Sequence, residues 1–219
     1  MPERLRIILP PLRGEIVAHY EEERAQAHAW RLGMWAFIAS ELLMFSGLFL
    51  SFVYYRWAYP VTFAKAARAL GIGHASLAIV LLATGSLLLA MAELSSLRNQ
   101  WRSAASMMGI TALLGLGVVV TELLGWQGHL QNGLGPGRYF ASEELEGPGA
   151  SLFFSLYYIF GGLHLLHVLV GACILLWLTA VIMRGKRKTP PYLPLQMMAL
   201  YWNFTLVVGL VAYPLFHLS

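Results

Sequence analysis

The sequence predicts an all-α integral membrane protein, a bundle of five transmembrane helices. Of the 219 residues, 58% are hydrophobic and only 12% are charged, and the mean hydropathy is +0.63. A soluble domain usually has about a quarter charged residues and just under half apolar ones. So large an apolar excess cannot be buried inside a chain of this length, because much of a folded protein remains surface. We therefore expect the excess to face lipid.

Five stretches of the chain are long and apolar enough to cross a bilayer, which takes about 20 residues of helix. Helices are expected because a strand open to lipid leaves backbone hydrogen-bonding groups unpaired. The fourth stretch would be about 50 Å long as one helix, so we expect it to tilt or to protrude. The tail before the first span is residues 1–31, and the transmembrane domain is residues 32–218, with spans at about 32–57, 73–94, 104–126, 151–183 and 195–218.

Short polar linkers separate the predicted spans. Arg98–Arg102 joins the second span to the third, and Arg184–Pro194 joins the fourth to the fifth. The longest linker, Gln127–Ala150, is rich in glycine and glutamate. We interpret it as a solvated loop that could serve as a contact surface.

Lysine and arginine are unequally divided between the two sides of the predicted bundle. The tail and the two linkers on its side, Arg98–Arg102 and Arg184–Pro194, carry eleven of them, and the opposite side carries four. Because cytoplasmic loops are enriched in basic residues, the N-terminus is predicted in the cytoplasm and the C-terminus outside. The net charge of +4 is explained by this bias, so no nucleic-acid partner is expected. The eleven are Arg4, Arg6, Arg13, Arg24, Arg31, Arg98, Arg102, Arg184, Lys186, Arg187 and Lys188, and the four are Arg56, Lys65, Arg68 and Arg138.

Glu41 is the acidic residue deepest in the predicted membrane, where a charge is costly and needs a reason. It lies nine residues into the first span, about 14 Å along a helix. One interpretation is a hydrogen-bonded carboxyl packed against a neighbouring helix. The other is a part in proton movement or ligand gating, and the two are compatible. Glu93 and Glu122 lie nearer the span ends and are interpreted as structural or partner-facing.

His164 and His167 lie three residues apart in the fourth span, so they share one helix face. Imidazole is a common metal and haem ligand. A membrane haem usually needs a second histidine at the same depth on a facing helix, and the remaining histidines lie in the tail, in a loop or at span ends. We therefore expect interhelical hydrogen bonds from this pair, and no metal or cofactor in the chain. The sequence also has no nucleophile with a base and no phosphate-binding loop, so we expect no active site.

Three segments carry a resemblance to a known family. These are Gly33–Phe49, with Ser40-Glu41 inside it, Gly162–Val168, and Tyr201–Phe204. In order, they resemble the embedded-glutamate helix, the two-histidine signature and the last-span signature of subunit III of the haem–copper oxidases. The likeness covers about residues 30–217, and five spans match the short form of that subunit. The chain departs from the family's usual residues at Gly125, Asn203 and Leu206.

The resemblance implies a non-catalytic subunit III of a proton-pumping terminal oxidase in a bacterial plasma membrane. Such a subunit packs against subunit I in a complex that also holds subunit II, binds phospholipid, and supports oxygen access and proton uptake. Haem and copper are expected in the partner subunits. Carried over to this sequence, the candidates for lipid binding or for a proton or oxygen path are Glu41, His164, His167 and Trp202.

Three alternatives stay open from the sequence. The same fold could serve a nitric oxide reductase. A small proton-coupled transporter could use Glu41 as its proton site, although such transporters usually show inverted repeats. A di-haem membrane cytochrome would need histidines that the predicted spans lack.

Overall fold

The computed structural model describes residues 12–142, 145, 147, 149–185 and 192–218. These residues form six α-helices and one short 3-10 helix, and no strand is present among them. The predicted all-helical fold is therefore confirmed for the part of the chain that the structure describes. The elements are α1 (Leu12–Ala58), α2 (Pro60–Leu70), α3 (Gly73–Leu97), α4 (Trp101–Gln131), η1 (Gly137–Tyr139), α5 (Ala150–Met183) and α6 (Tyr192–His217).

Five helices in the described residues have the length and the apolar composition to cross a membrane: α1 from Ala25 onward, α3, α4, α5 and α6. Each predicted span overlaps one of them, although the helices extend beyond the predicted bounds at most ends. The largest difference is α1, which begins at Leu12, inside the predicted tail. The orientation of the bundle in the bilayer stays a prediction.

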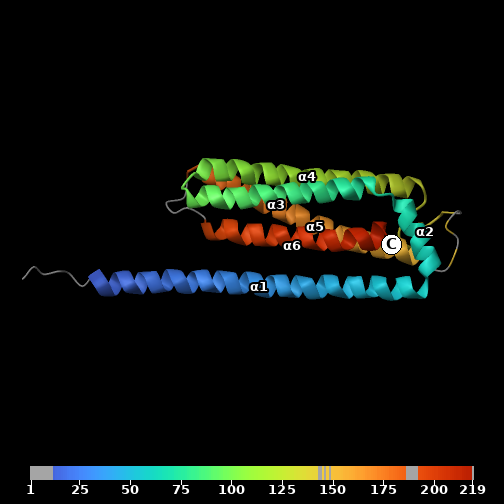
Figure 1. Cartoon of the computed structure of the whole chain (residues 1–219), viewed down its shortest axis with the longest axis horizontal. Coiled ribbons are helices and arrows are strands. Elements are labelled where there is room, and N and C mark those ends of the chain that lie inside the picture. The colour runs from blue at the N-terminus through green and yellow to red at the C-terminus, as the bar shows by residue number, and fades with distance from the viewer. Residues whose placement is uncertain (1–11, 143–144, 146, 148, 186–191, 219) are drawn as a thin grey trace, which may run out of the picture. The chain divides into compact units, whose positions relative to one another are not determined.

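The chain forms two compact units, residues 1–40 and residues 41–219. In the first unit, the described residues form the N-terminal part of α1. The second unit holds the rest of α1 and all the other helices. In Figure 1, α3, α4, α5 and α6 run along one another, and α2 crosses them at one end.

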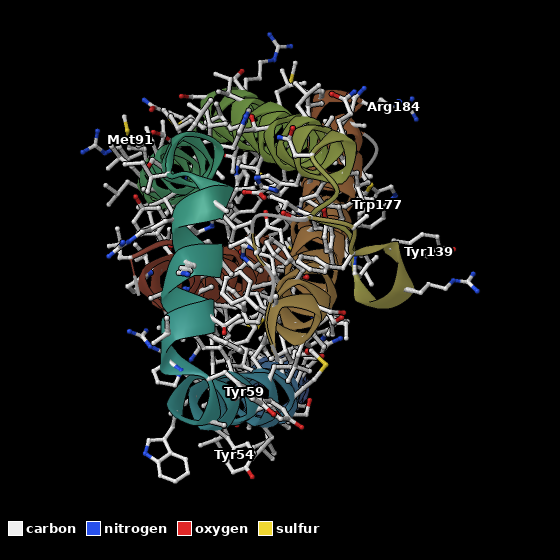
Figure 2. All side chains as sticks on the ribbon, turned by 90° about the vertical axis from the view of Figure 1, so that its right-hand side faces the viewer. Tyr54, Tyr59, Met91, Tyr139, Trp177 and Arg184 are labelled. Carbon is white, nitrogen blue, oxygen red and sulfur yellow. The ribbon has the colours of Figure 1, made fainter. Side chains whose placement is uncertain are left out.

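Helix α2 was not predicted, because its 11 residues include Lys65 and Arg68 and are too few to span a bilayer. It has Pro60 in its first turn, a position that suits the fixed φ of proline. Its buried residues, Phe63, Ala66, Ala67 and Leu70, follow the spacing of a helix with one apolar face. That face packs on α5 and α6. Figure 2 views the bundle from this end, with α2 across the front.

The prediction for Gln127–Ala150 as a solvated loop was partly wrong. Helix α4 continues through Gln131, and Leu134 then pairs with Phe140 as an isolated antiparallel bridge. The Phe140 ring stacks on Phe154 of α5, with 5.6 Å between centroids. Apolar side chains flanking the glycines thus hold this part of the segment against the bundle.

The indole of Trp202 in α6 fills the centre of the four-helix bundle. It is fully buried, and its Nε1–H donates a hydrogen bond of 3.1 Å to the carbonyl of Leu82 in α3. A Cβ on Gly85 of α3 would lie 2.9 Å from the indole, one on Gly115 of α4 would lie 2.8 Å from it, and one on Gly171 of α5 would lie 3.6 Å from it. Glycines on three helices therefore make the space for one tryptophan, as small residues do at close helix contacts in membranes.

Large apolar side chains cover the outside of the bundle. Tyr54 of α1, Met91 of α3 and Trp177 of α5 are exposed, and Figure 2 shows them pointing outward from three different helices. A soluble protein rarely exposes so much contiguous apolar surface. A bundle with a tightly packed interior and this exterior fits a lipid environment.

Candidate functional site

Two of the predicted site residues, Glu41 and His167, meet between α1 and α5. Nε2 of His167 lies 3.0 Å from Oε2 of Glu41, and the two side chains are 13% and 17% exposed. The ring of Phe45, one helical turn after Glu41, meets the His167 ring edge to face at 5.4 Å. This hydrogen bond agrees with the first interpretation of Glu41, a carboxyl bonded to a neighbouring helix, and a part in proton movement or ligand gating stays a prediction.

The other ring nitrogen of His167 determines how many protons the pair can hold. Nδ1 lies 2.7 Å from the carbonyl oxygen of Leu163 on the same helix. A carbonyl only accepts, so Nδ1 carries a hydrogen, and Nε2 either accepts a proton from Glu41 or has received one. The hydrogen bond between Glu41 and His167 thus contains one proton, which either partner can hold.

Tyr201 of α6 completes this cluster, and sequence reasoning did not select it as a site residue. Its hydroxyl donates to the backbone carbonyl of His167 over 2.9 Å, and its ring lies parallel to the imidazole with 6.4 Å between centroids. The sequence signal that could have identified Tyr201 is its place directly before Trp202 in the last-span signature. Through the hydrogen bond from its hydroxyl, Tyr201 positions the backbone of His167.

Aromatic packing anchors this part of α1 on α5 and α6. Phe45 contacts Phe160 at 5.4 Å between centroids, and further along α1 Phe52 contacts Phe153 and Phe216 at 5.9 and 4.5 Å. Such ring pairs add about 0.5–1.5 kcal/mol each beyond their burial. The Glu41–His167 bond therefore lies beside an apolar seam of aromatic contacts between α1, α5 and α6.

His164 has a different environment from His167, although both lie on α5. Its Nε2 lies 3.0 Å from the carbonyl oxygen of Thr205 in α6, so the expected interhelical hydrogen bond is present. It also lines a cavity among α3, α4, α5 and α6 that holds Glu122. The structure thus divides the two predicted histidines between two sites.

Trp202, the fourth predicted site residue, directs its only polar atom to α3 and packs against glycines there and on α4 and α5. Its place in the structure is the bundle core. The departure at Asn203 has a partner as well, because its side-chain oxygen accepts a hydrogen bond from Ser86 of α3. Nothing in the structure explains the departure at Leu206.

Among the described residues, no group of three or more His, Cys, Asp or Glu side chains is placed to hold a metal ion. The expectation that the chain binds no cofactor stays a prediction. What the Glu41–His167 pair can do chemically is hold and pass one proton, or offer a hydrogen bond to a polar group that approaches its exposed edge.

Comparison with known proteins gives one informative relative. No protein-family model matches the chain. The heme-copper oxidase subunit I+III of Aeropyrum pernix is 24% identical to it over 194 residues, which cover 86% of the chain. The match takes up 22% of that protein, so the chain spans about a fifth of its relative's length.

Proposed function

We propose that the chain is a non-catalytic subunit III of a proton-pumping haem–copper terminal oxidase. The observation that carries this proposal is the similarity, over 86% of the chain, to a protein named for subunits I and III together. The relative joins the two subunits in one polypeptide, as its name states. A subunit III-like chain would then pack against subunit I, and would meet subunit II in the same complex.

The Glu41–His167 pair supports this role from the chemistry of the chain itself. It is a proton-holding group about 14 Å into the predicted first span, at a partly exposed edge between α1 and α5. There it can lie beside the acyl chain of a bound phospholipid or take part in proton uptake by the partner. The bilayer in question is a bacterial plasma membrane, with the N-terminus of the chain in the cytoplasm.

Haem and copper belong to the partner subunits in this proposal. The contribution of the chain is to stabilise subunit I, to hold lipid along the apolar seam of α1, and to keep a path for oxygen and protons open. The large exposed apolar side chains of the bundle, including those in Figure 2, give it surface for both lipid and subunit I.

The experiment is a turnover assay on the purified complex with Glu41→Ala, Glu41→Gln and Ser46→Ala chains. Ser46 is a matched control, because it lies on the same helix and its hydroxyl bonds only to Leu43 of that helix. We expect all three complexes to assemble. Glu41→Ala should reduce the number of turnovers before inactivation or change how the turnover rate depends on oxygen concentration. Ser46→Ala should do neither. If Glu41→Ala matched the wild type in activity and lifetime, Glu41 would be a packing residue only.

A further inference from the structure

A second polar site lies among α3, α4, α5 and α6, and its His164 is one helical turn from His167 on α5. Its cavity is bounded by α3, α4, α5 and α6 and has a volume of about 60 Å³. Most of its lining is apolar. The polar groups that line it are Glu122 of α4, Tyr157 and His164 of α5, and Tyr213 and His217 of α6.

Three of these polar groups are already fixed by hydrogen bonds to the protein. His164 donates from Nε2 to the carbonyl of Thr205, and His217 donates from Nδ1 to the carbonyl of Gly71. The remaining nitrogen of each neutral ring is then an acceptor. The hydroxyl of Tyr213 is 2.7 Å from the hydroxyl of Ser76. The cavity is thus lined by oriented groups.

The Glu122 carboxyl has no hydrogen-bond partner among the residues that the structure describes. Glu122 is partly buried, and a carboxyl in an apolar setting is stabilised when a polar group or a water meets it. The cavity beside it has room for water, and a buried water makes about three hydrogen bonds to such groups.

The size of the cavity decides what can occupy it. One water needs about 10–15 Å³ of such volume, so roughly four waters fit, whereas a benzene-sized ligand takes about 150 Å³. An organic cation of benzene size is therefore too large for the cavity. Water and the proton it carries are the ligands of matching size and polarity.

We propose that this cavity is a hydrated proton-binding site, in which a short chain of waters links Glu122 to His164 and His217. A hydronium that enters gives its proton to the carboxylate or to an imidazole and remains as water. His217 lies beside α2, at the end of the bundle, and His164 is the inner end of the path. The site does not depend on the identity of the partner complex.

Other titratable groups lie on the helices around the cavity. His74 of α3 packs beside Gly125 of α4, and His129 of α4 bonds to the carbonyl of Leu70 in α2. Tyr158 of α5 follows Tyr157 in the chain. Any proton on these histidines lies near the α2 end and would oppose a second proton on His217.

Infrared spectroscopy of the full-length protein tests the proposal. We expect a protonated-carboxyl band on acidification that Glu122→Gln removes and that shifts rapidly in D₂O, because water reaches the group. Ala212→Leu fills the cavity from its buried wall and should abolish the rapid shift. Ala83→Leu, at an exposed position on α3, is the control and should leave the shift unchanged. The absence of a band that depends on Glu122, or a rapid shift that survives Ala212→Leu in a folded protein, would overturn the proposal.

A measurement on the unmodified protein covers the case in which a variant fails to fold. Tyr157 lines the cavity and Tyr201 does not, yet they are 7% and 6% exposed. Radiolytic hydroxyl labelling, which activates water bound inside proteins, should modify Tyr157 several-fold faster than Tyr201. Equal labelling of the two tyrosines would also overturn the proposal.

Discussion

His167 of α5 and Glu41 of α1 share one hydrogen bond of 3.0 Å. Because the second nitrogen of His167 donates to the carbonyl of Leu163, a single proton is shared between the carboxyl and the imidazole. The pair therefore links two helices and also holds one proton.

Because the pair links α1 to α5, it should contribute measurably to the free energy of unfolding. Glu41→Ala and His167→Ala should each lower the free energy of unfolding in detergent, and a double-mutant cycle should give a coupling of about 0.6–1.7 kcal/mol. The coupling is expected because each single variant leaves a polar group without its partner. Ser46→Ala, whose hydroxyl bonds within α1, should show no coupling to His167→Ala. A coupling energy of zero between Glu41→Ala and His167→Ala would contradict the hydrogen bond.

The core tryptophan allows a stronger prediction. Trp202→Ala should destabilise the bundle by about 3–5 kcal/mol, because it leaves a cavity at the meeting point of four helices. The matched control is Trp177→Ala, since Trp177 is 56% exposed on the outside of α5. That change should cost within about 0.5 kcal/mol. Similar losses for the two variants, measured by unfolding of the isolated chain in detergent, would contradict the packing described here.

The spans were predictable from sequence because lipid demands long apolar helices with their backbone groups paired internally. Helix α2 was not, because a short helix that caps the bundle shows only four buried residues and carries two basic ones. The bridge between Leu134 and Phe140 also depends on a tertiary contact, with Phe154, that a local pattern does not contain.

The candidate site was predicted only in part. Glu41 was found because an acid in lipid needs a reason, and the histidines because they share a face of α5. Which helix each histidine meets depends on helix rotation, and this assigns His167 to Glu41 and His164 to Thr205. The cavity around Glu122 collects residues from four helices that no spacing in the chain links together.

Substitution by alanine should have opposite effects on stability at two glycines of α4. In Gly115→Ala the new Cβ would lie 2.8 Å from the Trp202 indole and 3.2 Å from Ala172, so overpacking should cost about 1–3 kcal/mol. In Gly117→Ala the nearest atom, on Leu81, is 3.5 Å away, which is ordinary contact. That variant should gain up to about 1 kcal/mol of helix propensity. Thermal unfolding in one detergent compares them, and equal shifts in Tm would contradict the close approach at Gly115.

The central claim, that this chain accompanies a haem–copper oxidase without carrying its cofactors, is tested most directly by co-purification. The full-length chain is tagged, isolated in mild detergent from its native membrane, and assayed for partner polypeptides, haem and copper. The account predicts a haem- and copper-bearing catalytic subunit I in near-equal amount, and no stoichiometric haem or copper on the chain after the two are separated. Stoichiometric haem or copper on the isolated chain, or a partner that is a nitric oxide reductase or no haem protein at all, would contradict it.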